Sequence, residues 1–451
     1  MGNRLTRRTF LKSTAASAAA IFAGPRILKA MGANGKVNVA IIGAGGRGNA
    51  HVGGAAGENI VALVDVDFGR ASKAAKNYAD VKRFSDYRKM FDKMEKEIDA
   101  VSVATPDHNH ACASMMAIKR GKAVYCEKPL TWSVAEARAL TEAAREHKVT
   151  TQMGNQGHCG AGYRVLVEWI RAGAIGKVLE THSWTNRPIW PQGLKTRPAA
   201  TAVPEGLDWD CWIGPAPFRE YHEGLHSFKW RGWCDFGGGA LGDMACHIMD
   251  GTFWANNLGY PTSVTLEEST ELCEETFPQS THIMWEFPDR QKPEGCQIDM
   301  PAMKVHWWDG KKRPPIVAEL EKKHNRRLES SGTVYIGEKG IMYTGCYGGG
   351  VGILDKDQNE EFKKTAPKDV VPKPDGDSSF GNYYASIKAG KPGYSSFDYA
   401  GPFSETVLMG NLSIRAGKGV KVLWDGKNME VTNKPELNKF ISREYRKGWE
   451  L

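Results

Sequence analysis

A glycine-rich turn directly after an apolar strand constrains the fold of this chain more than any other feature. Residues 36–42 predict a buried strand, and residues 43–48 follow the pattern GxGxxG. In such a turn Gly43 permits the tight bend, Gly45 lets the backbone approach a pyrophosphate, and Gly48 lets the next helix pack closely on the strand. The N–H groups at the start of that helix attract phosphate. We therefore expect a dinucleotide to be bound by Gly43, Gly45, Gly46, Arg47 and Gly48.

Predicted strands and helices alternate over about 120 residues after the turn, as in a parallel sheet covered by helices. Ser133 and Glu136 form a capping box at the start of one of these helices. The strands expected after the first are residues 60–64, 98–104, 122–126 and 150–153. We therefore predict the α/β fold class, with a doubly wound Rossmann domain over residues 34–155.

An acidic residue follows the second predicted strand. Asp65 lies 22 residues after Gly43, the distance at which a carboxylate binds the ribose hydroxyls of a dinucleotide. A carboxylate there also repels the additional phosphate of NADP. We therefore expect NAD as the cofactor, with NADP as the alternative because Arg70 is close by in the sequence.

The first 33 residues carry most of the excess positive charge. Six of the 60 Lys and Arg residues lie there without an acid, which leaves 54 basic and 52 acidic residues, a net charge of +2. Such a charge, without a basic recognition motif, disfavours nucleic-acid binding. Arg7 and Arg8 precede Phe-Leu-Lys and a short apolar run, an order that resembles a twin-arginine export signal. We expect export to the periplasm; the alternative is a disordered basic tail.

Nine cysteines are scattered through the chain without a CxxC pair. This pattern predicts neither a disulfide framework nor a metal site. No run of 18 uncharged apolar residues occurs, so we expect no membrane span.

Three motifs together identify a family. They are the glycine turn at 43–48, the sequence Cys-Glu-Lys-Pro at 126–129, and the segment 237–250, which begins with three glycines and contains Asp243 and His247. With these motifs the chain resembles the glucose–fructose oxidoreductase and inositol dehydrogenase (Gfo/Idh/MocA) family over nearly its whole length after residue 33.

The resemblance implies further site residues and a second domain. It implies an α+β domain with an open, largely antiparallel sheet over residues 156–451, which binds substrate and supports a homo-oligomer, a dimer or a tetramer. It also implies a cofactor-contacting turn within 105–110. The cofactor-binding residues implied in this way are Thr105, Pro106, Asn109, His110, Glu127, Lys128 and Gln156.

Lys128, Asp243 and His247 are the candidate catalytic residues. An ammonium group at Lys128 favours the alkoxide-like character that develops as a hydride leaves carbon. Asp243 and His247 are four residues apart and share one face of a helix. His247 is a suitable general base, since its ordinary pKa lies near working pH, with Asp243 or Asp250 as a possible partner. The structural alternatives are a surface lysine, a helix cap and a core histidine.

Ten of the 14 tryptophans lie between Trp184 and Trp308. Aromatic faces beside hydrogen-bond donors suit a sugar ring, although the same residues also suit a packed interface. The predicted substrate-binding residues are Asn186, Arg187, Trp190, Trp230, Arg231, Asp243 and His247.

We therefore expect an exported NAD(P)-dependent oxidoreductase that acts on a carbohydrate or polyol. Since no nicotinamide pool exists outside the cytoplasm, we expect the cofactor to be carried out bound and recycled in the site. Two alternatives stay open. One is a redox-neutral glycoside hydrolase that acts through transient oxidation at C3 and elimination, and the other is a non-catalytic sugar-binding or sensing protein.

Overall fold

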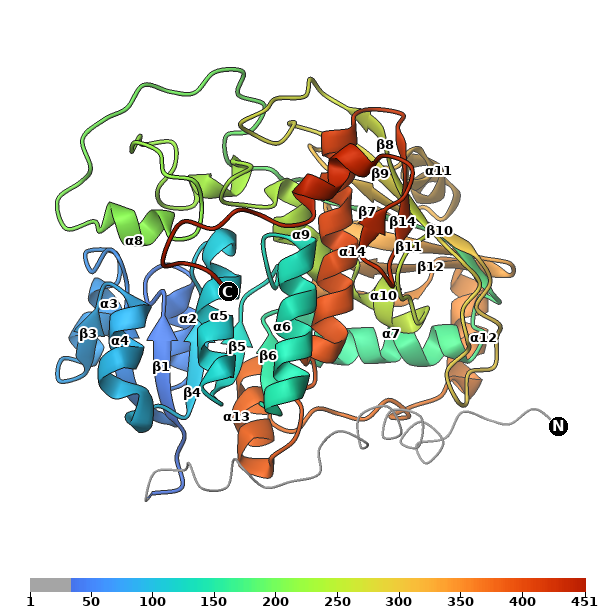
Figure 1. The fold of residues 1–451 in the computed structure, drawn as a ribbon. Coiled ribbons are helices and arrows are strands. Elements are labelled where there is room, and N and C mark those ends of the chain that lie inside the picture. The colour runs from blue at the N-terminus through green and yellow to red at the C-terminus, as the bar shows by residue number, and fades with distance from the viewer. Residues whose placement is uncertain (1–33) are drawn as a thin grey trace.

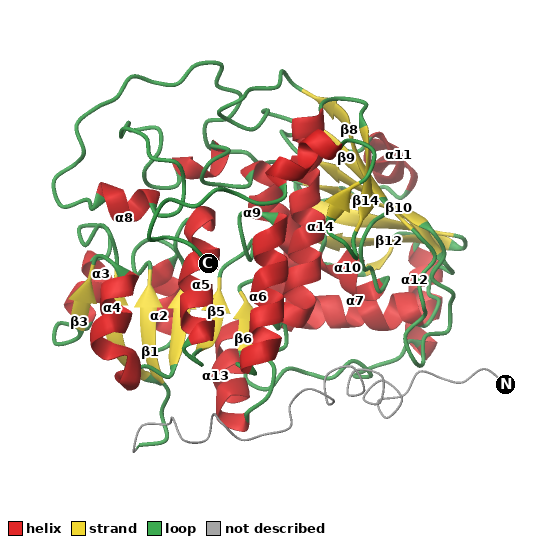
Figure 2. Ribbon diagram, viewed as in Figure 1, coloured by secondary structure: helices red, strands yellow, loops and turns green. Residues whose placement is uncertain are grey.

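Two β-sheets organise the part of the chain that this computed structural model describes, residues 34–451 (Figures 1 and 2). The predicted export signal lies outside the described residues. Figure 1 shows the first sheet in the N-terminal half of the molecule and the second beside it, with long helices between them.

The first sheet is parallel throughout, with the strand order β3-β2-β1-β4-β5-β6. Its strands are β1 (Asn38–Ile42), β2 (Asn59–Val64), β3 (Lys82–Phe84), β4 (Ala100–Val103), β5 (Ala123–Cys126) and β6 (Thr151–Met153). The central strands β4 and β5 are buried at every position, as expected for a sheet covered on both faces. The predicted doubly wound Rossmann fold is confirmed.

Helices cover both faces of this sheet. Apolar side chains of α4 (Tyr87–Met94), α5 (His110–Lys119) and α6 (Val134–His147) pack on one face. Those of α2 (Gly48–Gly54), α3 (Ser72–Asn77) and α13 (Ser379–Ala389) pack on the other. The capping box of Ser133 and Glu136 is present at the start of α6. The helix α13 therefore packs on the first sheet, although it lies within residues 156–451, which the sequence analysis assigns to the second domain.

The second sheet is mostly antiparallel, in the order β13-β12-β11-β7-β10-β9-β8-β14-β15. Its strands are β7 (Val178–Trp184), β8 (Ser263–Ser269), β9 (Thr281–Phe287), β10 (Met303–Trp308), β11 (Gly332–Gly337), β12 (Gly340–Gly345), β13 (Gly352–Ile353), β14 (Lys421–Asp425) and β15 (Glu430–Val431). One pair, β7 and β10, is parallel. The predicted open, largely antiparallel sheet is confirmed.

One face of the second sheet packs on α7 (Ala161–Arg171), α9 (Gly239–Ile248), α10 (Asp250–Ala255) and α14 (Phe397–Ala416) in a core that continues into the Rossmann domain. On the other face, α11 (Pro315–Lys323) covers Trp184 and Trp308. The connection from β7 to α9 carries α8 (Trp209–Ile213), and the connection from β13 to α13 carries α12 (Lys356–Thr365). This arrangement places α9 directly against the end of the first sheet.

Within residues 34–451, no helix has the length and apolar character needed to cross a membrane. The nine cysteines, all of which lie in this part of the chain, are unpaired, and most are buried or half-buried packing residues.

Candidate active site

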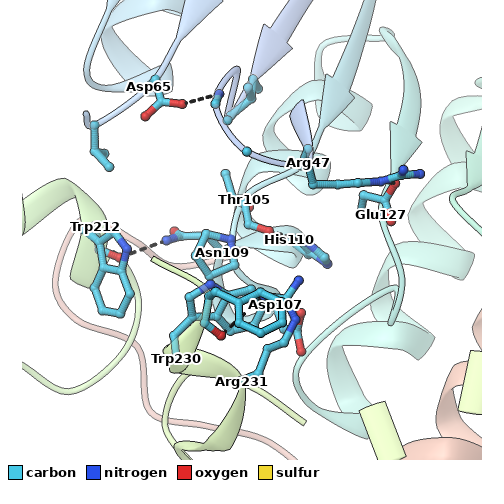
Figure 3. Close-up of a pocket in the computed structure, with 18 of the residues that line it drawn as sticks. Arg47, Asp65, Thr105, Asp107, Asn109, His110, Glu127, Trp212, Trp230 and Arg231 are labelled. Atoms are coloured by element: carbon cyan, nitrogen blue, oxygen red, sulfur yellow. Dashed lines mark hydrogen bonds and ion pairs between the residues drawn. The ribbon is translucent and has the colours of Figure 1, made fainter. Parts of the chain in front are cut away.

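A cavity of about 480 Å³ opens at the carboxyl ends of β1, β2, β4 and β5 (Figure 3). Ligands bind at this edge in open parallel sheets. The three candidate catalytic residues, Lys128, Asp243 and His247, line the cavity together. The predicted cofactor residues that line it are Gly43, Gly45, Gly46, Arg47, Asp65, Thr105, Pro106, Asn109, His110, Glu127, Lys128 and Gln156.

The glycine turn has the shape that a dinucleotide needs. Gly43 has a φ of +82°, and a Cβ there would lie 2.8 Å from the backbone carbon of Ala104. Gly48 does not line the cavity; instead, a Cβ at Gly48 would lie 1.7 Å from the carbonyl oxygen of Gly43. Gly48 therefore serves the close packing of α2 on β1, while the other glycines leave room for a pyrophosphate beside the backbone. The glycine turn at residues 43–48 therefore forms a cradle that fits NAD.

Asp65 is held at the edge of this cradle. Its two carboxylate oxygens accept hydrogen bonds from the N–H groups of Gly45, at 2.8 Å, and Asp67, at 2.9 Å. Burial raises the pKa of Asp65, and the two N–H groups limit that rise. Arg70 lines the same end of the cavity. The carboxylate therefore occupies the position predicted for a ribose contact, with a cation nearby.

The substitution Asp65→Ser is expected to lower the preference for NAD over NADP by at least about tenfold, equivalent to about 1.4 kcal/mol. It removes the carboxylate that repels the 2′-phosphate and leaves Arg70 available to bind it. The measurement is kcat/KM with each cofactor, with the exposed Asp80→Ser as the matched control. An unchanged ratio in Asp65→Ser would show that another residue selects the cofactor.

The turn after β4 is fixed by its histidines and amide. The ring nitrogens of His110 lie 2.8 Å from the carbonyl oxygen of Pro129 and 2.9 Å from that of Thr105. Asn109 donates from Nδ2 to the carbonyl oxygen of Trp212 at 3.2 Å, and His108 Nε2 lies 2.9 Å from the same oxygen. Burial lowers the pKa of His108 to about 3. His108 and Asn109 therefore join the cofactor turn to the loop around α8, and His110 joins it to Pro129.

The carboxylate of Glu127 lines the cavity and contacts two neighbouring side chains. Its Oε1 accepts from Arg47 Nε at 2.7 Å and lies 3.0 Å from His51 Nε2, while Ser102 Oγ lies 2.7 Å from His51 Nδ1. Burial acts to raise the pKa of Glu127, but His51 and Arg47 lower it by more. The net shift is downward, so the carboxylate stays charged. Glu127 therefore anchors Arg47 beside the glycine turn.

Lys128 is paired across the domain boundary. Its Nζ donates to the backbone oxygen of Asp243 at 2.8 Å and to Asp243 Oδ1 at 3.1 Å, and Arg231 Nε donates to the same Oδ1 at 3.0 Å. Burial lowers the pKa of Lys128, but the Asp243 carboxylate outweighs it and the net shift is upward. Burial raises the pKa of Asp243, but Lys128 and Arg231 bring it down to about 2. Lys128 is therefore an ammonium at working pH and Asp243 a carboxylate.

His247 stands one helical turn beyond Asp243 on α9. The side chain is buried, and its Nδ1 has no hydrogen-bond partner among the described residues. Burial and the Lys128 charge lower its pKa to about 3, so the imidazole is neutral at working pH. The ring of Tyr347 lies over it, with the centroids 4.6 Å apart.

The prediction that Asp243 or Asp250 orients His247 is wrong. Asp243 is occupied by Lys128 and Arg231, as described above. Asp250 Oδ1 lies 2.9 Å from His158 Nδ1 and accepts from Tyr399 Oη at 2.5 Å. The helix α9 ends at Ile248 and Asp250 begins α10, so the two residues do not lie on one continuous helix face, and Asp250 belongs to a buried network of the core.

A further carboxylate of the cavity, which was not predicted, is buried. Asp107 follows β4 and lines the cavity with Lys128, Arg231 and Asp243. Its Oδ2 accepts from the N–H of Gly238 at 3.2 Å. Burial raises its pKa to about 7, with Lys128 and Arg231 opposing that shift. The sequence signal that could have identified Asp107 was its position between Pro106 and His108, within the predicted cofactor turn.

Asp107 is expected to make stability depend on pH. The folded state holds its proton up to about pH 7, whereas an unfolded chain releases it near the ordinary pKa of 3.8, so stability falls as pH rises between these values. In Asp107→Asn the loss of Tm between about pH 5 and about pH 7.5 is therefore expected to be smaller than in the unsubstituted protein. Thermal unfolding at both pH values measures it, with the exposed Asp80→Asn as control. Equal losses in the two proteins would contradict the assignment.

The predicted substrate residues divide into two groups. Arg187, Trp230 and Arg231 line the cavity with Asp243 and His247. Asn186 and Trp190 do not line it: Asn186 Oδ1 accepts from Arg187 at 2.6 Å, and the buried Trp190 donates to Gln192 Oε1 at 2.7 Å.

Most of the tryptophan-rich segment fills the core. The fully buried tryptophans are Trp184, Trp233, Trp285 and Trp307. A cluster around α8 buries three more, Trp209, Trp212 and Trp230. The packed-interface alternative therefore describes most of the segment, whose tryptophans lie in the core of the sheet and in the cluster around α8. Trp212, Trp230 and Trp449 are the tryptophans in the cavity wall.

Tyr347 and Trp449 were also missed. Tyr347 has a φ of +59° in a glycine-rich turn after β12, a conformation that non-glycine residues rarely adopt. Trp449 packs edge-on to Tyr87 and under Arg88, whose guanidinium carbon lies 3.7 Å from the ring centroid. Both residues enter the cavity from segments that the motifs do not include.

Comparison with known proteins supports what the geometry indicates. Residues 37–155 match the model of an oxidoreductase family with an NAD-binding Rossmann fold, and residues 174–294 match that family's C-terminal alpha/beta domain. An inositol 2-dehydrogenase of Acidothermus cellulolyticus is 30% identical over 190 residues, which cover 41% of this chain and 55% of that protein. The matched region thus spans about half the length of the curated relatives.

Solved structures share the fold at low identity. The WlbA dehydrogenase of Bordetella pertussis, solved with NADH and UDP-GlcNAcA, is 16% identical with a TM-score of 0.58 over 86% of this chain and 99% of that one. The aldose-aldose oxidoreductase of Caulobacter crescentus is also 16% identical, with a TM-score of 0.54 over 86% of this chain and 100% of that one. From the two family models and the site described above, the chain belongs to the Gfo/Idh/MocA oxidoreductase family.

Proposed function

We propose that this protein is an NAD-dependent oxidoreductase that oxidises a secondary hydroxyl group of a sugar or polyol. The observation that carries the proposal is the convergence of Lys128, Asp243 and His247 on the cavity that contains the glycine cradle. The names of related proteins, inositol 2-dehydrogenase and levoglucosan dehydrogenase, support this substrate class.

Lys128 and His247 account for the charge and the proton of the substrate hydroxyl group. The substrate hydroxyl binds between Lys128 Nζ, which donates to its oxygen, and the neutral His247, which accepts its proton. As the C–H and O–H bonds break, a C=O bond forms, and the ammonium of Lys128 stabilises the negative charge that develops on oxygen. NAD, when bound, takes up the hydride. Asp243, which Arg231 holds by a second hydrogen bond, keeps Lys128 in place, and His247 is left to act as the base.

The predicted export signal supports a finer proposal. A dehydrogenase outside the cytoplasm has no pool of NAD to exchange with, so the cofactor must stay bound and be reoxidised by a second substrate. Oxidation of one sugar coupled to reduction of another meets this requirement. A solved structure with the same fold is named an aldose-aldose oxidoreductase, which gives a precedent for such chemistry.

The decisive experiment uses the undialysed protein recovered from the periplasm. We expect mass spectrometry to find bound nicotinamide and a panel of sugars to cause transient absorbance of the reduced cofactor. Protein that is free of nicotinamide, or that remains in the cytoplasm, would refute the carried-cofactor proposal. Absence of reduction with every sugar and polyol, in protein loaded with NAD, would refute the oxidoreductase and favour a sensing protein. Release of an aglycone without net reduction would indicate the glycoside hydrolase instead.

A further inference from the structure

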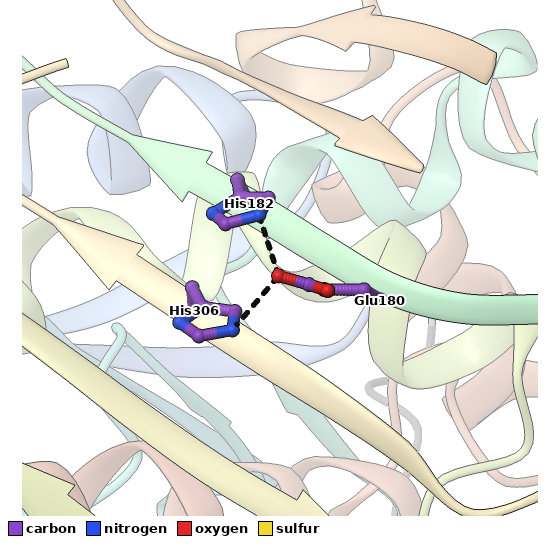
Figure 4. A group of neighbouring side chains, drawn as sticks. All are labelled: Glu180, His182 and His306. Carbon is purple, nitrogen blue, oxygen red and sulfur yellow. Dashed lines mark ion pairs between the residues drawn. The ribbon is translucent and has the colours of Figure 1, made fainter. Parts of the chain in front are cut away.

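The second sheet carries a group of chemically capable side chains that the proposed oxidation does not use. Glu180 and His182 lie on β7, and His306 lies on β10 (Figure 4). Residues two apart on a strand share a face, and the parallel register pairs His306 with His182. We propose that Glu180, His182 and His306 bind a divalent transition-metal ion, for which Zn²⁺ is the best fit.

The distances suit a single ion. Glu180 Oε1 lies 2.8 Å from His182 Nε2 and 3.1 Å from His306 Nε2, and the three ligand atoms lie within 4.8 Å of one another. Ligand atoms held about 2.0–2.1 Å from one Zn²⁺ ion are separated by about 2.9–3.4 Å at octahedral to tetrahedral angles. Movements of the side chains by about 1 Å or less therefore admit the ion. Two imidazoles and one carboxylate are a donor set that zinc accepts, with a fourth position left for water.

His306 points Nε2 at the Glu180 carboxylate at ion-pair distance (Figure 4). Its buried Nε2 has no hydrogen-bond partner in the described part of the chain, although Glu180 Oε1 is 3.1 Å away. Its Nδ1 lies 2.9 Å from Nε2 of His282 on β9. When Nδ1 carries the proton and donates to His282, the lone pair of Nε2 faces the carboxylate. A metal ion between the two groups satisfies both, and an outer partner such as His282 is typical of a metal-bound histidine.

His182 must change its tautomer to bind. Trp308 Nε1 donates to His182 Nδ1 at 3.3 Å, which leaves the proton of His182 on Nε2, facing Glu180. Coordination through Nε2 moves that proton to Nδ1 and breaks the contact with Trp308. The contact is at the long end of the hydrogen-bond range. Its loss leaves the N–H groups of Trp308 Nε1 and His182 Nδ1 without this partner, a cost that metal binding must exceed.

The site lies on the opposite face of the sheet from the active site. His182 and His306 share their face with Trp184 and Trp308, under α11, whereas Trp307 points into the core toward α9. The side chain of Glu180 is 36% exposed, which gives an ion and water access from solvent. An ion here would join β7 to β10, the parallel pair of this sheet, and its expected effect is on stability.

The test is a titration of the untagged, metal-depleted full chain with Zn²⁺ and, separately, with Co²⁺. We expect one ion per chain, a higher Tm with Zn²⁺, and visible Co²⁺ bands of a low-symmetry site without the sulfur charge-transfer band that the cysteines would give. His182→Gln and His306→Gln are each expected to weaken binding by at least about 100-fold. The exposed His147→Gln serves as the matched control and should bind as the unsubstituted chain does.

Several results would overturn the proposal. One is the absence of stoichiometric Zn²⁺ binding by the unsubstituted chain, and another is a sulfur band in the Co²⁺ spectrum. The third is an affinity in His182→Gln and His306→Gln equal to that of the unsubstituted chain. Circular dichroism establishes whether the variants fold. If they do not, the spectrum and stoichiometry of the unsubstituted chain decide the question. The Zn²⁺ readouts do not involve turnover, so failure of the proposed oxidation leaves them interpretable.

Discussion

Replacing Lys128 with Met is expected to lower kcat/KM for the sugar by at least about 10²–10³-fold while NAD still binds. Methionine keeps the length and apolar stem of the side chain but removes the ammonium that the Asp243 carboxylate holds over the cavity. The charge that develops on the substrate oxygen then loses its nearest stabilising group. Steady-state kinetics gives the loss, and titration with NAD shows whether the cradle is intact.

The control for this variant is Lys96→Met, the same change at an exposed position. Arg231 remains beside Asp243 in Lys128→Met, so the buried carboxylate keeps one cationic partner and the fold is expected to survive. If Lys128→Met turned over at the rate of the unsubstituted protein, Lys128 would have no part in the chemical step.

Replacing His247 with Gln is expected to lower kcat/KM by about 10²–10⁴-fold, the range that a positioned general base contributes. Glutamine retains hydrogen bonding but accepts no proton at working pH. His147→Gln is the matched surface control. Activity that survived the change at His247 would place the base elsewhere in the cavity.

The pH dependence of kcat/KM is an independent test of His247 as the general base. Because the pKa of His247 is about 3, its base form persists in acid, and kcat/KM should show no loss due to this residue between about pH 7.5 and about pH 5.5. A base with the ordinary pKa of about 6.5 would lose about tenfold over that interval. An acid limb near pH 6.5 that disappears in His247→Gln would show that the imidazole titrates normally.

Local patterns predicted the Rossmann domain well. The strand and glycine turn at residues 36–48, the capping box at Ser133 and the Glu-Lys-Pro sequence after β5 each depend on contacts within a few residues, and each lies where it was expected. The strand β3 and helix α4 were missed. The strand β3 has three residues, two of them exposed basic ones, and so carries no apolar pattern that a sequence can reveal.

Long-range pairing explains what the sequence could not predict. The even spacing of Glu180 and His182 was visible, but His306 joins them only because β10 lies parallel to β7, and no local signal sets that register. The partner of Asp250 likewise depends on the placement of His158 and Tyr399 by separate elements. In the tryptophan-rich segment, composition alone could not separate side chains that face the core from those in the cavity wall.

The helix α13 and Trp449 have a consequence for how the protein matures. The glycine turn is synthesised early, but one face of its sheet is covered by Tyr383 and Ile387 of α13, and Trp449 closes the cavity wall about 400 residues after Gly43. A nascent chain that has only its first sheet outside the ribosome therefore exposes apolar surface and lacks part of the nucleotide pocket. We therefore expect cofactor binding to follow the docking of these distant segments.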